Sequence, residues 1–260
     1  MNDPIRLEWP SEAHARLVLA RPERRNALGH DELKGLDRAT EVLARREPRV
    51  VSIVAEGSTF GVGGDIKAFA DALDRNDMER WLRDAGSHLK PAMARLRALD
   101  AAVVVGVQGA AAGGTLGLVW AADHVIAADD LRINLAYARL GGSPDAGTSW
   151  FLPRLVNPLR AFELFALTPT LDAQQALHHG LVNRVVPVVD LRSSVDAVVQ
   201  QLLNVPPRSL ANIKRLLRES QRNDLERQLF LEFEAFVDAV DAPEFRDRVR
   251  AFSSTGSTSR

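Results

Sequence analysis

Blocks of apolar and polar residues alternate along the first 190 positions, and the pattern favours an α/β architecture. Short apolar runs, typical of strands buried on both faces, are followed by polar or glycine-rich turns and then by apolar positions at helical spacing. Strands are predicted at residues 15–20, 50–55, 103–107, 124–128, 132–134 and 181–186. Helices are predicted at residues 31–46, from 65 onward, and at 115–122, 149–155, 159–167 and 172–179. Repetition of strand, turn and helix indicates βαβ units with parallel strands.

After residue 190 the pattern becomes helical throughout, with a break at Pro206-Pro207. The segment 225–240 places phenylalanines on one stripe, and such an apolar helix surface has to be buried on the core or on a neighbouring subunit. The last eight residues are small and polar, which is typical of disorder. The predicted organisation is a core of residues 1–190, a helical oligomerisation region of residues 191–252 and a disordered tail of residues 253–260.

Composition is that of an ordinary globular enzyme, with 260 residues, 46% of them hydrophobic and 26% charged. The formal net charge of −1 gives no reason to expect binding to nucleic acid or to an anionic membrane. Because the chain has no cysteine, disulfides, thiolate nucleophiles and cysteine-ligated metals are excluded, and a reducing cytoplasm fits. We expect neither a signal peptide nor a transmembrane helix, since no apolar stretch approaches ~18 residues. No spaced set of His, Asp and Glu resembles a metal site.

Two glycine-rich loops, residues 57–64 and 109–114, share one design. Each follows a predicted buried strand and opens a predicted helix. Glycine there lets a ligand approach the backbone closely, and the helix start leaves free N–H groups. Two such helix starts that converge would bind an oxyanion, although tight packing of helix on strand explains each loop taken alone. Neither loop has the spacing of a P-loop or of a dinucleotide-binding fingerprint.

Together with three other segments, these loops resemble the crotonase (enoyl-CoA hydratase/isomerase) superfamily, over roughly residues 5–252. The matching segments are residues 21–28 (RPERRNAL), 60–67 (FGVGGDIK), 107–123 (beginning VQGAAAGG), 142–154 (GSPDAGTSWFLPR) and 172–183 (DAQQALHHGLVN). The resemblance implies a ClpP-like spiral of ββα units with a helical C-terminal trimerisation region. It also implies a homotrimer or a dimer of trimers, and acyl-CoA substrates whose coenzyme A belongs to the thioester, with no separate cofactor.

The resemblance also assigns site residues. The backbone N–H groups of Gly64 and Gly114 would hold the thioester oxygen as it becomes an enolate. Contacts to the acyl-CoA would come from Arg25, Ala27, Gly61, Gly63, Asp65, Ile66 and Lys67. Arg25 and Lys67 would pair with phosphates, although each reads equally as a solvated surface charge.

The acid–base residues depart from the hydratase pattern. Hydratases of the family use two glutamates, and the corresponding positions are Gly117 and Tyr137, so both carboxylates are missing. Asp145 follows Pro144 at a place where double-bond and ring-epoxide isomerases of the family carry an aspartate. One carboxylate suffices to move a proton between two carbons. Locally, Asp145 also fits a helix N-cap.

The surroundings of Asp145 and Tyr137 allow further expectations. Burial among Leu140, Trp150 and Phe151 would raise the pKa of Asp145 toward a useful value. Tyr137 would line the acyl pocket or donate a hydrogen bond, with plain packing as the alternative.

The sequence therefore predicts an acyl-CoA double-bond or ring isomerase of fatty-acid or aromatic-acid catabolism, with Asp145 as proton shuttle. In pattern it is closest to 2-(1,2-epoxy-1,2-dihydrophenyl)acetyl-CoA isomerases and to dienoyl- or enoyl-CoA isomerases. Two alternatives stay open. One is another crotonase reaction with non-standard residues, such as hydration, hydrolysis or C–C cleavage. The other is an inactive acyl-CoA-binding homologue.

Overall fold

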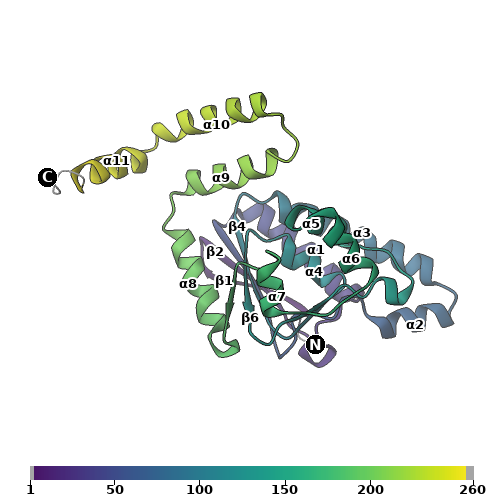
Figure 1. Ribbon diagram of the computed structural model, residues 1–260. Helices are drawn as coiled ribbons and strands as arrows, with labels where there is room; N and C mark the ends of the chain where they lie inside the picture. Colours follow the sequence, from purple (N-terminus) through teal and green to yellow (C-terminus); the bar gives the residue numbers. More distant parts are fainter. Residues whose placement is uncertain (1–2, 256–260) are drawn as a thin grey trace. The chain divides into compact units, whose positions relative to one another are not determined.

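The computed structural model describes residues 3–255 and separates into two compact units. The first unit ends at Gln200 and the second begins at Gln201, so the division falls within helix α8 (Leu191–Leu203). Figure 1 follows the chain from the sheet of the first unit to the helices of the second. None of the helices within residues 3–255 is both long and apolar enough to cross a membrane.

A six-stranded sheet is the centre of the first unit, in the order β1-β2-β3-β4-β6-β9. Its strands are β1 (Ile5–Ser11), β2 (His14–Leu19), β3 (Val50–Ala55), β4 (Ala102–Val107), β6 (His124–Ala128) and β9 (Arg184–Val186). Only β1 runs antiparallel to its neighbour, and the other pairs are parallel. The strands predicted from continuous apolar runs form the interior of this sheet, as expected for parallel strands covered on both faces.

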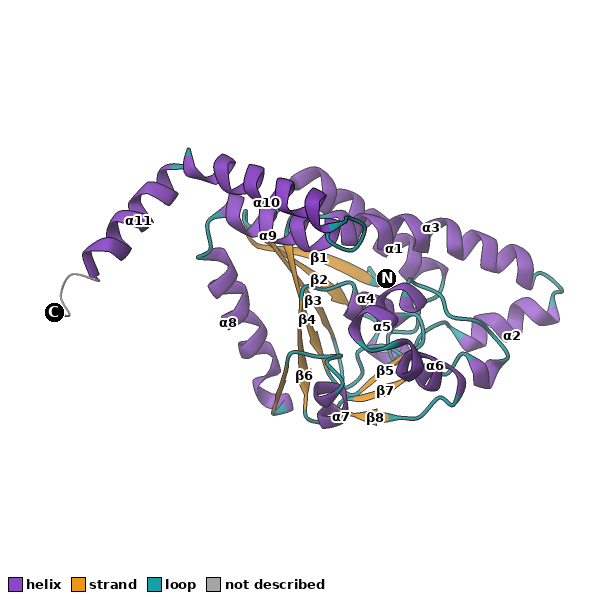
Figure 2. Cartoon of the chain, turned by 45° about the horizontal axis from the view of Figure 1, so that its top comes forward, coloured by secondary structure: helices purple, strands orange, loops and turns teal. Residues whose placement is uncertain are grey.

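Helices cover both faces of this sheet. Figure 2 shows α1, α3 and α4 on one side and α8 on the other, where Val195 and Leu191 of α8 pack over Gly106 of β4. The α-helices of the first unit before α8 are α1 (His30–Arg46), α2 (Ile66–Asp74), α3 (Met78–Ala98), α4 (Thr115–Trp120), α5 (Thr148–Leu155), α6 (Pro158–Ala166) and α7 (Ala173–His178). The 3-10 helices are η1 (Pro22–Arg24), η2 (Ala138–Leu140) and η3 (Val188–Asp190).

A second, three-stranded sheet lies close to the glycine loops. It consists of β5 (Ala110–Ala112), β7 (Arg132–Asn134) and β8 (Leu171–Asp172), in the order β5-β7-β8. Strand β5 is the middle of the second glycine loop, so this small sheet fixes that loop from the side. Ala111 pairs with Ile133, and Ile133 pairs with Leu171.

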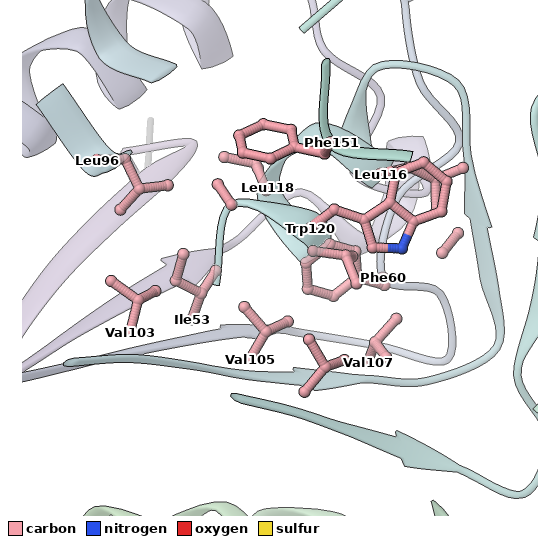
Figure 3. Packing of buried hydrophobic residues seen from close by; sticks show 14 of the residues in the cluster. Ile53, Phe60, Leu96, Val103, Val105, Val107, Leu116, Leu118, Trp120 and Phe151 are labelled. Carbon is pink, nitrogen blue, oxygen red and sulfur yellow. The ribbon is translucent and has the colours of Figure 1, made fainter. Parts of the chain in front are cut away.

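The core of the first unit lies between the large sheet and helices α1, α3, α4 and α5. Phe60, Leu116 and Leu118 are at most 1% exposed and meet the side chains that project from β3 and β4 (Figure 3). Phe60 belongs to the first glycine loop and Leu116 follows the second. Burial of these two side chains therefore anchors both loops to the core, at a gain of about 1.5–3 kcal/mol for each large apolar side chain.

The second unit contains α9 (Pro207–Glu219), α10 (Leu225–Val240) and α11 (Pro243–Thr255). Pro207 takes the first position of α9, where a proline costs nothing, in agreement with the predicted break. The prediction of a disordered tail from residue 253 is wrong for Ser253–Thr255, which complete α11. There the hydroxyls of Ser253 and Ser254 donate back to the carbonyls of Arg250 and Ala251, which satisfies both polar groups within the helix. Residues 256–260 lie outside the described part of the chain.

Candidate active site

The two glycine loops are joined by backbone hydrogen bonds. Gly61 N donates to Ala110 O at 3.1 Å, and Gly61 O accepts from Ala112 N at 2.9 Å. The buried hydroxyl of Thr115 also donates to Gly61 O, at 2.9 Å. Gly61 is therefore a structural link between the loops rather than a free ligand-binding group.

Glycine is required where the loops touch. Gly63 has φ +84°, and a Cβ there would lie 3.0 Å from Ala112 O and 3.3 Å from Gly113 Cα. A side chain at this position would push the loops apart. The residues directly before Gly64 and Gly114 are thus in van der Waals contact, which holds the two predicted oxyanion donors close together.

The amides of Gly64 and Gly114 are unpaired donors at the place where the two loops meet. Leu28 bonds to the residues on either side of Gly64, through Gly63 O at 2.8 Å and Asp65 N at 3.2 Å. Gly114 is the N-cap of α4, where the N–H has no partner within the helix. Neither amide has an acceptor anywhere in residues 3–255. Both are available to a ligand.

Gly64 and Gly114 line the same cavity, of about 660 Å³, together with Asp145. Most of its wall is apolar and comes from α1, α2 and α3. The apolar side chains of that wall are Leu28, Leu33, Phe69, Trp81, Leu82, Ala85, Leu89 and Met93. Phe69 meets the ring of Trp81 edge-on, with centroids 4.9 Å apart, and His30 stacks on the Trp81 ring with centroids 4.4 Å apart. The cavity combines an apolar wall with two free amides and, beside them, the carboxylate of Asp145, which suits an apolar acyl group with a polar head.

Asp145 lies directly over the second loop. A Cβ on Gly114 would be 3.0 Å from Asp145 Oδ1 and 3.6 Å from Oδ2, so the carboxyl group faces this glycine. The alternative role as a helix cap is not seen, because α5 begins at Thr148 with Gly147 as N-cap and no side-chain capping bond. Only the main-chain carbonyl of Asp145 serves the helix start, accepting from Thr148 N at 2.9 Å and from Thr148 Oγ1 at 2.8 Å.

The carboxyl of Asp145 is held by Tyr137, whose hydroxyl donates to Oδ1 at 2.7 Å. Burial raises the pKa of Asp145 above its ordinary value, although the hydrogen bond from Tyr137 acts in the opposite direction. The residue keeps access to solvent through the cavity, and partial loss of hydration is enough to raise the pKa. The residues expected to shield the carboxyl of Asp145 differ from the prediction. Leu140 is 63% exposed, and the ring of Trp150 stands edge-on against Phe151. Leu140 therefore does not bury the carboxyl as predicted.

Gly117 has no room for a side chain beside the turn that this chain forms at residues 145–147. A Cβ there would lie 2.3 Å from Ala146 O and 2.7 Å from Ala146 Cβ. Ala146 itself has φ +51° and Gly147 has φ +79°, so a tight left-handed turn fills the space beside α4. The turn that presents Asp145 thus occupies the place where a glutamate at position 117 would begin.

The residues predicted to contact coenzyme A divide into two groups. Arg25, Ile66 and Lys67 are exposed and lie outside the wall of the cavity. Ala27 is 8% exposed and belongs to the core. The carboxylate of Asp65 is already engaged, because Oδ1 accepts from Ala68 N at the start of α2 and Oδ2 pairs with Arg24. Its side chain stabilises the first loop and the start of α2.

Sequence reasoning missed two residues of the site. Thr148 is fully buried, and its hydroxyl lies 3.3 Å from Tyr137 Oη; nothing in a lone threonine after glycine indicates this role. Phe69 lines the cavity and is the residue that a Cβ on Gly64 would strike, at 2.7 Å. Within residues 3–255 no three His, Asp or Glu side chains are grouped to hold a metal ion.

A parallel α/β core with two converging glycine loops and an apolar cavity defines a class of acyl-thioester enzymes, and comparison with known proteins agrees. Residues 11–258 match the family model described as enoyl-CoA hydratase/isomerase, so the chain belongs to this family, the crotonase superfamily. A probable enoyl-CoA hydratase of Rhodobacter capsulatus is 32% identical over 246 residues, 93% of this chain and 92% of the relative. The 1,2-epoxyphenylacetyl-CoA isomerase of Escherichia coli is 31% identical over 242 residues, 91% and 90% of the two chains. A crystal structure described as a putative enoyl-CoA hydratase/isomerase of Mycobacterium abscessus superposes with a TM-score of 0.91 at 30% identity, covering 96% of each chain. The chain thus has the crotonase fold.

Proposed function

We propose that the protein is an acyl-CoA isomerase that shifts a double bond or rearranges a ring-derived acyl group, with Asp145 as the proton shuttle. One observation carries the proposal: a single carboxylate with raised pKa lies over Gly114 in a cavity that also exposes the free amide of Gly64. Membership of the hydratase/isomerase family makes the substrate class an acyl-CoA thioester.

The arrangement suits proton transfer through an enolate. Asp145 removes a proton from a carbon next to the conjugated system, and the electron pair delocalises onto the thioester oxygen. The amides of Gly64 and Gly114 donate to that oxygen, and one such donor contributes about 2.7–4 kcal/mol of transition-state stabilisation. The protonated Asp145 then returns its proton to a different carbon, so the double bond moves and no water is consumed. A raised pKa helps because the same group has to act as base and as acid.

Hydration fits the site less well. A glutamate at position 117 is excluded by contact with Ala146, and the residue at the second glutamate position is Tyr137, whose hydroxyl already donates to Asp145. One carboxylate would have to activate a water and protonate the adjacent carbon. The isomerase reaction needs only the groups that are present.

The remaining expectations belong to the same proposal. Arg25 and Lys67 are exposed cations and would pair with the phosphates of coenzyme A. The second unit leaves much of its apolar surface open, with Phe230, Phe233 and Phe236 between 52% and 65% exposed. Assembly into a homotrimer or a dimer of trimers would bury this surface.

The first test is the Asp145→Asn variant, which keeps the size of the side chain and removes the base. We expect isomerase turnover on a panel of unsaturated and aryl acyl-CoAs to fall at least 10³-fold, while acyl-CoA binding changes by less than about threefold. Asp100→Asn, at an exposed position before β4, is the matched control.

Product mass decides between the reactions. Isomerisation leaves the mass unchanged and exchanges substrate protons for deuterium in heavy water, whereas hydration adds one water. Full turnover by Asp145→Asn, or water addition as the main reaction of the wild type, would overturn the proposal.

A further inference from the structure

The chain contains one tyrosine, Tyr137, and its hydroxyl is aimed at the proposed proton shuttle. Burial, reinforced by the neighbouring charge of Asp145, raises the pKa of Tyr137 above its ordinary value. The phenol therefore stays protonated throughout the pH range in which enzymes of this kind are assayed. It can only donate in its bond to Asp145, and the carboxylate oxygen accepts.

The position of the phenol is set by the backbone around it. Tyr137 O accepts from Leu140 N and from Gly142 N, both at 3.0 Å, and closes the turn after β7. Its ring rests near Phe165, with centroids 6.1 Å apart. The turn therefore places the phenol hydroxyl beside the carboxyl of Asp145.

This turn is also connected to the second glycine loop. Asn134 O accepts from Gly113 N at 3.2 Å, three residues before Tyr137 and one before Gly114. The hydrogen bond between Gly113 and Asn134 thus links the segment that carries Tyr137 to the loop that carries the Gly114 amide. An acyl group held by the Gly114 amide would lie next to a carboxylate whose Oδ1 is bonded to Tyr137.

Each oxygen of the Asp145 carboxyl has a different environment. Oδ1 accepts from Tyr137, and no side chain among residues 3–255 donates to Oδ2. A hydrogen bond from the backbone of Asp145 itself also lowers the pKa of this carboxyl. Thr148 holds only the main-chain carbonyl of Asp145, and its hydroxyl is 3.3 Å from the phenol oxygen. The other charged residues lining the cavity are Glu79, Arg83 and Lys90, all on α3, and Arg83 is paired with Glu79 at 2.6 Å.

We propose that Tyr137 is a positioning residue that holds Oδ1 of Asp145, so that Oδ2 alone takes and returns the substrate proton. The inference rests on the proposed function. It assigns a role to the residue that stands where hydratases have their second glutamate. One oxygen serving both transfers keeps them on one face of the acyl group, and the proton removed is the proton returned unless it exchanges with water.

The test compares Tyr137→Phe with wild type on the best acyl-CoA of the panel. Loss of the hydroxyl frees the carboxylate to rotate, so we expect kcat to fall about 10- to 100-fold with KM changed by less than about threefold. Loss of the hydrogen bond also raises the pKa of Asp145 further, because that bond lowers it in the wild type. The acidic limb of the kcat/KM profile should therefore move to higher pH.

Phe165→Leu is the matched control, since it weakens packing against the tyrosine ring and leaves the hydroxyl in place. It should leave the acidic limb where it is in the wild type. Titration of the ¹³C-labelled Asp145 carboxyl by NMR gives a second readout that needs no turnover, with a higher pKa expected in Tyr137→Phe.

An acidic limb and a carboxyl titration that are both unmoved in Tyr137→Phe would overturn the role of Tyr137. The result for Asp145→Asn separates this from the proposed function. If Asp145→Asn is inactive while Tyr137→Phe behaves as the wild type, only the positioning role fails. If Asp145→Asn keeps full turnover, the proposed function fails.

Discussion

The polar groups at the cavity come from the main chain in one region and from side chains in another. The glycine loops, residues 57–64 and 109–114, contribute main-chain amides and hardly any side chain. The segment from residue 134 to residue 148 contributes the carboxylate of Asp145 to the cavity lining. The hydroxyls of Tyr137 and Thr148, also from side chains, lie outside that lining, and the Tyr137 hydroxyl donates to Asp145. The first region is held by bonds between the loops, and the second by a turn with left-handed residues at positions 136, 141, 146 and 147.

The main-chain donors are provided by the fold, whereas the acid–base side chains can be changed by substitution. Amides at a loop keep their donors under almost any substitution, so the enolate stabilisation that we propose would depend on the fold rather than on side chains. The acid–base groups are side chains and can be exchanged one residue at a time. Here glycine and tyrosine stand where hydratases have glutamates, and Asp145 provides the carboxylate that faces the second glycine loop. One scaffold can thus carry hydration or isomerisation.

The largest loss of activity is expected when the glutamate of hydratases is introduced at position 117, next to the turn that carries Asp145. In Gly117→Glu, the new Cβ alone would approach Ala146 O to 2.3 Å, so the turn of residues 145–147 has to move. Because displacement of a reacting group by about 1 Å costs about 10²-fold, we expect isomerase turnover to fall at least 10³-fold with a full glutamate.

Gly117→Ala should have a smaller effect on the same turn. We expect a smaller loss of activity and a destabilisation of about 1–3 kcal/mol from overpacking. Turnover and chemical denaturation of both variants are the measurements. Hydratase activity in Gly117→Glu would show that the turn of residues 145–147 moves at little cost. The contact with Ala146 would then not be what excludes a glutamate from position 117.

The backbone half can be tested by removing one amide. Gly114 has φ −61°, which proline can adopt, so Gly114→Pro deletes the N–H without demanding a new backbone angle. We expect kcat to fall about 10²- to 10³-fold, as for other lost oxyanion donors. Gly114→Ala is the control, since it adds the same Cβ, 3.0 Å from Asp145 Oδ1, and keeps the amide. Equal losses in the two variants would mean that crowding of Asp145, and not the amide, explains the effect.

Much of the fold could be predicted from the sequence because its strands are continuous apolar runs. The predicted bounds of β3, β6, β7 and the later α10 are those of the structure. Strand β1 was missed because it lies at the edge of the sheet, where Arg6 and Glu8 alternate with half-buried apolar residues. Edge strands owe their conformation to the neighbouring strand, and a window of seven residues carries little of that information.

Some features of the site could likewise be predicted from the sequence, and others could not. Local requirements for glycine at contacts such as Gly63 with Ala112 leave a pattern in the sequence. The bond between Tyr137 and Asp145 leaves none, because seven residues and a turn with Gly141 at φ +68° separate them. Nor could the exposure of Leu140 be anticipated, since it depends on the direction in which that turn leaves η2.

The smallest expected effect concerns the stability of the side-chain half. Burial raises the pKa of Asp145 in the folded state, so the folded protein binds this proton more tightly than the unfolded chain does. Ionised Asp145 therefore disfavours folding at pH values above its folded-state pKa, and this penalty disappears as pH falls below the unfolded-state value. We expect Asp145→Asn to unfold at a temperature equal to or slightly above that of wild type at pH 7, with the gap closing toward pH 4. Thermal unfolding across that range measures it, with Asp100→Asn as the reference. A variant clearly less stable than wild type at pH 7 would mean that the bond from Tyr137 outweighs the lost hydration of Asp145, so that the side-chain half of the cavity is held together by its catalytic groups rather than strained by them.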